Sequence, residues 1–276
     1  MANFHSDEWI MEQLNRHYQE ALTLFPKDRI VGVFLQGSQN YGLDYEGSDI
    51  DTKCFLVPTL EDIIFNKKPI STTHIRANEE HIDFKDIRLF LTTVRKQNLN
   101  FMEILFTKYK IVNPTYEPMW NRLIENNEQI ARYNPVGAVK TMKGIALEKY
   151  HAMEHRYPSK VDIIDKWGYD GKQLHHLLRV GEYLDRYVAG EPYADCLLTK
   201  KADLLKKVKD MSNPLYTLDV ARTIAGIQLG TINAVVDHFI EEHKDEPVDW
   251  HVDVLLDDVQ RDIMKLGIEL EMQKGE

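Results

Sequence analysis

The chain has 276 residues, of which 43% are hydrophobic, and a net charge of −10 at pH 7. A chain of this length buries a hydrophobic core and forms one or two domains. The negative charge argues against binding to long duplex DNA, because proteins that neutralise many backbone phosphates carry a basic surface.

Up to residue 113 the sequence predicts helices and strands around one small sheet. Ser6 can cap a first helix, whose apolar residues recur at helical spacing until Pro26 ends it. The elements predicted next are strands at 30–36, 50–57 and 80–86, a helix at 87–106 and a short strand at 108–112. The pair Asn113-Pro114 breaks the last strand.

Beyond Pro114 the pattern changes to helix after helix, and no strand-like alternation of any length returns. The predicted helices cover residues 120–131, 136–155, 171–188, 202–211, 217–243 and 252–273. The predicted fold class is therefore α+β, with a small mixed-sheet domain over residues 1–113 and an all-helical domain over residues 114–276. We expect the active site in the cleft between the two domains.

The most informative segment is Ile30–Pro58, in which two apolar runs flank a polar loop. The first run leads into Gly37-Ser38, and after ten intervening residues Asp49-Ile50-Asp51 opens the second run. Side chains at positions i and i+2 of a strand share a face, so the two acids lie side by side. Paired carboxylates suit a divalent cation such as Mg²⁺, and the amides of a glycine turn bind phosphate. The combination predicts chemistry on a nucleoside triphosphate.

The spacing of Gly37-Ser38 and Asp49-Ile50-Asp51 resembles the signature of the DNA polymerase β-like nucleotidyltransferase superfamily. That signature usually has a third acid on a later strand, and Asp83 is the candidate here. Asp86 competes for this position, but three residues along a strand its side chain points to the opposite face. The segment GSQNYGLDYEGSDIDTKCFLVP is most similar to a branch of predicted nucleotidyltransferases from bacteria and phages that is associated with RNA repair.

Two later segments are similar to the same branch. Lys96–Leu105 is similar to the segment after the third acid, and Tyr169–Gly190 is similar to a helix that carries Lys, His and Arg. Residues seven apart on a helix share a face, and three carboxylates with a triphosphate need positive charge besides the metal. The nucleotide-binding residues expected on this helix are Lys172, His176 and Arg179.

The resemblance implies a metal-dependent enzyme that moves a nucleoside monophosphate from an NTP, such as ATP, to an acceptor hydroxyl and releases pyrophosphate. It implies two Mg²⁺ ions, or Mn²⁺ in their place, held by the catalytic acids Asp49, Asp51 and Asp83. Gly37 and Ser38 would hold the triphosphate. An RNA end is the acceptor that suits this branch. A protein or small-molecule acceptor, and a non-catalytic nucleotide-binding regulator, are the alternatives left open.

Other motifs give weaker signals. His151–His155 matches the inverted zinc motif H-x-x-E-H by letter, but no third ligand identifies itself, and neither G-x-S-x-G nor HExxH occurs. Two cysteines are too few for a disulfide framework or a Cys-based zinc site. No apolar run approaches the ~20 residues that cross a bilayer, and the first residues lack a secretory signal. We expect a cytoplasmic protein without a membrane partner, in the host cytoplasm if a phage encodes it.

Overall fold

The computed structural model of the protein describes residues 4–213 and 215–274. It divides the chain into two compact units, which we call the sheet unit (Met1–Tyr133 with Val248–Glu276) and the helical unit (Asn134–Pro247). The α+β class is confirmed, because every strand of the described residues ends by Val112 and helices follow. Over the same residues, no helix is both long and apolar enough to cross a membrane.

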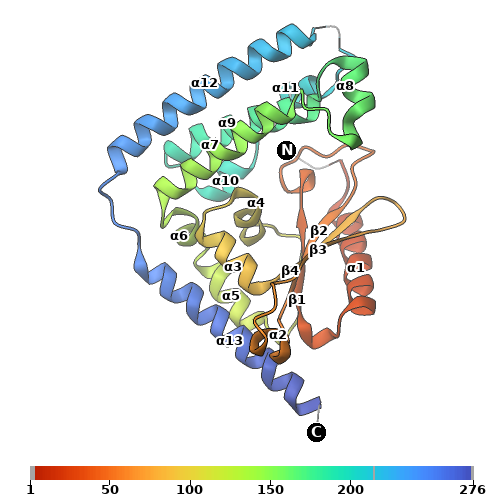
Figure 1. Ribbon diagram of the computed structural model, residues 1–276, viewed down its shortest axis with the longest axis vertical. Helices are drawn as coiled ribbons and strands as arrows, with labels where there is room; N and C mark the ends of the chain where they lie inside the picture. The colour runs from red at the N-terminus through yellow and green to blue at the C-terminus, as the bar shows by residue number, and fades with distance from the viewer. Residues whose placement is uncertain (1–3, 214, 275–276) are drawn as a thin grey trace. The chain divides into compact units, whose positions relative to one another are not determined.

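The sheet unit is built on a five-stranded mixed sheet with the order β3-β4-β2-β1-β5 (Figure 1). Its strands are β1 (Ile30–Gln36), β2 (Asp51–Leu56), β3 (Ser71–Ile75), β4 (His81–Asp86) and β5 (Lys110–Val112). β2 and β4 run parallel, whereas the other neighbours are antiparallel. The carboxyl end of β1 therefore lies beside the amino ends of β2 and β4.

One face of this sheet packs on α1 (Asp7–Leu24). The Ser6 side chain caps α1 by accepting a hydrogen bond from the Trp9 backbone N–H. Ile10 and Leu14 of the helix are fully buried in one core cluster with Cys54 and other inward residues of the sheet. Alternate side chains of each strand point to this face, and those in the core cluster are apolar.

The opposite face packs on aromatic side chains from the sheet and from later helices. The helices on this side are α3 (Ile87–Arg95), α5 (Glu117–Glu125) and α13 (Trp250–Lys274). The ring centroids of Phe34 and Trp120 are 4.2 Å apart, as are those of Phe55 and Phe90. α13 packs on α3 and α5, so both segments of the sheet unit share one core.

The division of the chain differs from the boundary expected at residue 113. α5, α6 (Asn127–Arg132) and α13 belong with the sheet, because fully buried Trp120 packs against its strands. The Asp249 backbone N–H donates to the Tyr133 carbonyl at 3.3 Å, where the chain leaves the helical unit. The sheet unit is thus formed by two chain segments, and the helical unit lies between them in sequence.

Local backbone geometry explains further differences from the expected elements. The helix expected over 87–106 is broken, because Gln97 has a left-handed φ of 56° and the Asn98 side chain caps a new helix, α4 (Leu99–Met102). Short elements not expected from the sequence include β3, α2 (Leu60–Ile64), α8 (Val161–Trp167) and α10 (Tyr193–Leu197). They carry no apolar pattern long enough to predict them.

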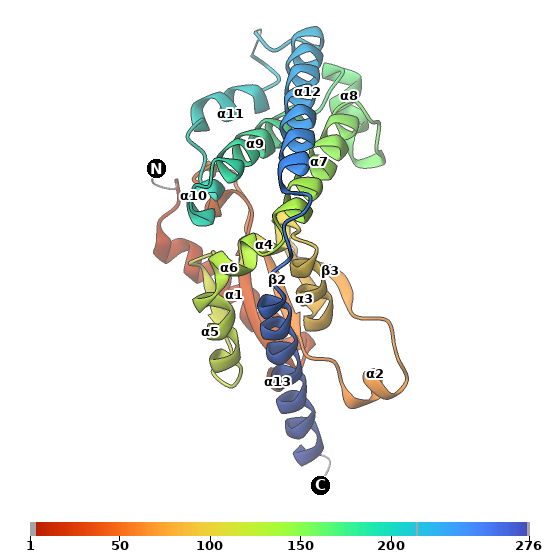
Figure 2. The ribbon, with the colours of Figure 1, turned by 90° about the vertical axis from the view of Figure 1, so that its left-hand side faces the viewer.

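The helical unit is centred on α9 (Gly171–Val188), which packs on α7 (Pro135–Ala152) and α12 (Leu218–His243) (Figure 2). α10 and α11 (Ala202–Lys209) also pack on α9. The Asp170 side chain caps α9 by accepting from the Lys172 backbone N–H at 2.9 Å. α9 has the same bounds as the helix predicted there.

Candidate active site

Two rows of polar side chains cross one face of the sheet where β1 ends. Asp51 of β2 lies opposite Gln36 of β1, and Lys53 of β2 lies opposite Asp83 of β4. Thr73 of β3 extends the second row, because it lies opposite Asp83. Residues opposite each other share a face, as do positions i and i+2 of one strand. The fold therefore places Asp51 and Asp83 on the same face, in neighbouring rows.

The turn after β1 borders these rows. Gly37 has a φ of 99°, a conformation that favours glycine. Ser38 begins the short 3₁₀ helix η2 (Ser38–Asn40), and its hydroxyl has no hydrogen-bond partner within residues 4–213 and 215–274. The Gln39 side-chain amide donates to the Asp49 carbonyl at 2.7 Å, which ties the turn to the acidic segment. The turn that is tied to Asp49 thus carries an unpartnered hydroxyl.

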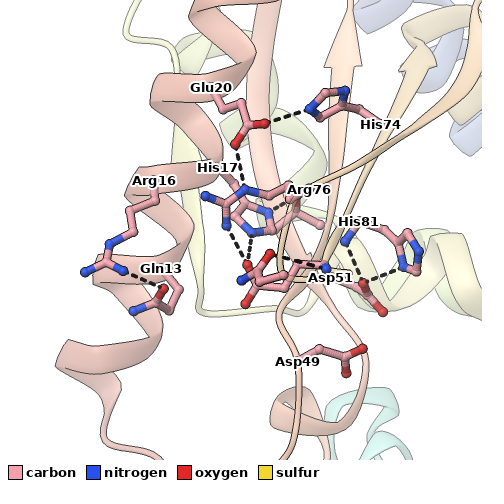
Figure 3. Close-up of polar contacts among 12 residues, drawn as sticks. Gln13, Arg16, His17, Glu20, Asp49, Asp51, His74, Arg76 and His81 are labelled. Atoms are coloured by element: carbon pink, nitrogen blue, oxygen red, sulfur yellow. Dashed lines mark hydrogen bonds and ion pairs between the residues drawn. The ribbon is translucent and has the colours of Figure 1, made fainter.

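Asp49 and Asp51 differ in their surroundings. Asp49 is exposed just before β2, whereas the carboxylate of Asp51 accepts from the His81 backbone N–H and contacts His81 Nδ1, both at 3.1 Å (Figure 3). Burial raises the pKa of Asp51, and the negative charge of Asp49 raises it further, against the opposing effect of His81. A cation bound to both carboxylates would relieve this repulsion.

The carboxylate of Asp83 has neutral partners on both sides and a cation nearby. The Thr73 hydroxyl donates to Asp83 Oδ1 at 2.5 Å, and the Gln36 amide donates to Asp83 Oδ2 at 3.4 Å. Lys53 Nζ lies 3.9 Å from the same Oδ2. These contacts fix the carboxylate within the rows.

Lys53 is a site residue that the sequence did not point to. Its side chain is buried, its Nζ donates to Gln36 Oε1, and the ring centroid of Phe101 lies 5.1 Å away. Burial lowers the pKa of Lys53 to about 8, although the charges of Asp83 and Asp51 oppose the change. The available signal was its position two residues after Asp51, which places both on one strand face.

The acids fit a metal ion only in part. Among the described residues, no three or more His, Cys, Asp or Glu side chains are grouped to hold one. Asp49 and Asp51 fit a divalent cation, because the two carboxylates are near enough to repel each other and Asp49 has no cationic partner in the described part of the chain. Asp83 does not fit equally well, because Lys53 already lies beside it. The prediction of three metal ligands stays a prediction.

A buried polar network lies on the opposite face of β2. His17 of α1 is fully buried, with Nδ1 2.9 Å from Thr52 Oγ1 and Nε2 3.0 Å from Glu80 Oε2. Arg76 pairs with Glu80 and with Glu20 of α1 (Figure 3). Burial raises the pKa of Glu80, but hydrogen bonds from His17 and Asn78 and the charges around it hold that pKa at about 2. The network joins α1 to the strands that carry the acids.

The three residues expected to bind the nucleotide lie on α9, in the helical unit. Lys172 is exposed, whereas His176 and Arg179 are partly buried. Burial lowers the pKa of His176 well below its usual value, and the nearby His175, Arg179, Lys172 and Lys149 lower it further. These basic groups therefore lie near one another within the helical unit. Their contact with a nucleotide stays a prediction.

Two acids from motifs that compete with the candidate site already form ion pairs with arginines. The Glu154 carboxylate of the H-x-x-E-H segment accepts two hydrogen bonds from Arg222, at 3.0 and 2.6 Å. Asp86, the competitor of Asp83, is buried, caps α3 and pairs with Arg88 at 2.6 Å. Both acids are therefore held by the fold.

Comparisons with known proteins do not show a family for this chain. No family model matches the chain, and no curated protein matches it. A solved structure of a nucleotidyltransferase-like protein from Exiguobacterium sibiricum 255-15 is similar over 96% of this chain and 92% of that chain. The sequence identity is 12% and the TM-score 0.30, which is too low to establish a shared fold.

Proposed function

We propose that the protein is a metal-dependent nucleotidyltransferase, which moves a nucleoside monophosphate from an NTP to an acceptor hydroxyl and releases pyrophosphate. The observation that carries the proposal is the shared sheet face of Asp51 and Asp83 beside the Gly37-Ser38 turn. Asp49 joins this arrangement through the hydrogen bond from Gln39. Nucleotidyl transfer needs a carboxylate pair for a divalent cation next to a phosphate-binding turn.

The donor nucleotide is bound at the turn. Asp49 and Asp51 would hold the divalent cation, which would supply positive charge for the triphosphate and the leaving pyrophosphate. The Ser38 hydroxyl donates to an oxygen of the β- or γ-phosphate. Gly37 lets the backbone approach the phosphates closely, because it has no side chain. The α-phosphorus is thereby fixed in line with the acceptor.

Asp83 is the group that activates the acceptor in this proposal. It accepts the proton of the acceptor hydroxyl as that oxygen attacks the α-phosphorus. Thr73 and Gln36 hold the carboxylate from two sides, so it keeps one orientation toward the attacking oxygen. The nucleotide-binding role expected of Lys172, His176 and Arg179 on α9 stays part of the proposal.

An RNA end is the acceptor that we propose, with ATP or another NTP as donor. The net charge of −10 suits a short end better than a long duplex, because few phosphates then need neutralising. A protein or small-molecule acceptor would use the same acids with a different second pocket. A non-catalytic regulator would bind the nucleotide only, and the presence of all three acids favours catalysis instead.

The test supplies Mg²⁺ and each NTP radiolabelled at the α-phosphate to the protein alone, with a short single-stranded RNA, or with an aminoglycoside. Label on the RNA supports the proposal, and label on the protein or the drug identifies an alternative acceptor. Bound NTP without any transfer identifies the regulator. Asp51→Asn should lower transfer at least about 100-fold, whereas Glu46→Gln, at an exposed acid of the same loop, should not lower it. Transfer that persists in excess chelator contradicts metal dependence.

A further inference from the structure

The third acid of the candidate site already has a cation beside it. Lys53 and Asp83 lie opposite each other on β2 and β4, with Nζ 3.9 Å from Oδ2. Lys53 is 5% exposed, and its Nζ also donates to Gln36 Oε1. The Gln36 amide in turn donates to Asp83 Oδ2. The ammonium is therefore built into the sheet face.

The surroundings give this ammonium one carboxylate partner. In the described part of the chain, Asp83 is the only acid with an oxygen within 4.0 Å of Lys53 Nζ. The Phe101 ring lies 5.1 Å from Nζ and offers the charge an aromatic contact. An ammonium that has lost most of its water depends on such partners, so Lys53 stays beside Asp83.

A second divalent ion on Asp83 would meet this charge. Oxygen ligands bind Mg²⁺ at about 2.1 Å, so an ion on Asp83 Oδ2 would lie within a few ångströms of Lys53 Nζ. Like charges at that separation repel strongly in a partly buried site. Asp49 has no cationic neighbour among the described residues, and the only one that pairs with Asp51 is His81.

We propose that the Lys53 ammonium takes the place of a second divalent ion at Asp83, so that the site binds a single ion, on Asp49 and Asp51. The inference rests on the proposed nucleotidyl transfer, and it replaces the expected pair of Mg²⁺ ions by one. Lys53 is then a positioning residue, whose fixed charge holds Asp83 opposite the ion.

Mn²⁺ binding to the whole chain tests this inference, with bound ions counted from the loss of the free-ion electron paramagnetic resonance signal. The wild type should bind one Mn²⁺, and Lys53→Met should bind two, because a neutral side chain releases Asp83. Lys85→Met is the matched control and should bind one. Lys85 follows Asp83 by two residues on the same face of β4, but its Nζ donates to the Ser71 hydroxyl at 2.9 Å.

A second variant decides the matter even if Lys53→Met fails to fold. Asp83→Asn should still bind one Mn²⁺, whereas a two-ion site would fall from two to one. Two ions on the wild type, or a single ion on folded Lys53→Met, would overturn the inference and leave the proposed function intact. No bound ion on any variant, together with no transfer of labelled nucleotide, would overturn both.

Discussion

The carboxylates of Asp49 and Asp51 lie close enough to repel each other at the start of β2, and this repulsion destabilises the metal-free protein. The pKa of Asp51 is raised in the folded state by burial and by Asp49. Folding therefore favours the protonated form of Asp51. The resulting stability is present below the unfolded-state pKa and is lost as the pH rises through the raised pKa. At neutral pH the metal-free site is destabilised by its own charge.

Asp51→Asn should remove both this destabilising charge and the activity. Without metal at pH 7, the variant should melt at the same temperature as the wild type or higher. The difference in melting temperature should vanish as the pH falls through the pKa of Asp51, because the wild-type carboxyl group then becomes neutral too. Nucleotide transfer should fall at least about 100-fold. Thermal unfolding in chelator over a pH series measures the first effect. A metal-free variant less stable than Glu46→Gln would contradict it.

Two variants in the turn after β1 distinguish the role of its backbone in phosphate binding from the role of the Ser38 side chain. Gly37→Val should destabilise the protein by about 1–3 kcal/mol, because valine is strained at a φ of 99°. The same change should remove nucleotide binding, since the backbone can no longer approach phosphate. Ser38→Ala keeps the backbone amides and should only raise KM for the NTP modestly. Denaturant titration and initial rates measure the two variants. A stable, active Gly37→Val protein would exclude the turn as the phosphate site.

At the scale of elements, the buried network of His17 and Glu80 joins α1 to the start of β4. The pKa of Glu80 lies at about 2, below its usual value of 4.5. A lowered carboxyl pKa stabilises the fold above the unfolded-state value, and this contribution is lost as the pH falls through the folded-state value. The pairing of α1 with the sheet is therefore expected to weaken in acid.

Glu80→Gln should cost up to about 3 kcal/mol of unfolding free energy at pH 7, the size that the pKa shift implies. The difference from the wild type should shrink between pH 4.5 and about 2, as the wild-type carboxyl takes up its proton. Glu79→Gln, at the exposed neighbouring position, should be neutral. Urea unfolding at several pH values gives these differences. A cost for Glu80→Gln that does not change with pH would rule out a role of its charge.

The packing of α13 can be tested by comparing a closely packed glycine of this helix with an unpacked glycine of α12. A Cβ on Gly267 would lie 2.5 Å from Val57 Cγ1, whereas a Cβ on Gly230 of α12 meets nothing within 4 Å. Gly267→Ala should destabilise the protein by about 1–3 kcal/mol through overpacking. Gly230→Ala should stabilise it by about 0.5–1 kcal/mol, because alanine favours helix. Equal effects in thermal melts would contradict the close packing of α13.

Elements with a strong local signal could be predicted from the sequence, and those decided by tertiary contacts could not. β1 reads as a continuous apolar run because both of its faces are buried. α9 has an Asp170 cap and a buried stripe along its length. β3 consists mostly of polar, exposed residues, so no alternation of apolar and polar residues predicts it. The motif predicts the acids of the site. The role of Lys53 depends on the strand register that places it opposite Asp83, and the sequence pattern does not predict that register.

At the scale of the whole molecule, the sheet unit consists of two segments that the helical unit separates along the chain. No sequence pattern predicts this return, because α13 has the same helical pattern as the helices before it. At Gly267 the lack of a side chain lets α13 approach Val57 and Tyr116 closely. Packing of this kind depends on shape, which helical periodicity does not record.

Replacing residues 134–247 by a short Gly-Ser linker should leave a folded sheet unit, because Tyr133 and Asp249 are already hydrogen-bonded to each other. A fragment of residues 1–113 should not fold, since it lacks Trp120 and α13 and exposes Phe34 and Phe55. Circular dichroism and cooperative urea unfolding distinguish the two. A folded 1–113 fragment would restore the boundary expected from the sequence.

The return of α13 also sets the order in which the protein can fold during synthesis. The ribosome releases the whole helical unit before α13, so the surface around Val57 and Tyr116 stays uncovered throughout that time. Contacts between distant segments form late, because the chain between them must first be closed. A helical unit that folds early brings the two ends of its own segment to fixed positions and shortens the search. Completion of the domain that carries the acids therefore waits for a helix encoded far downstream.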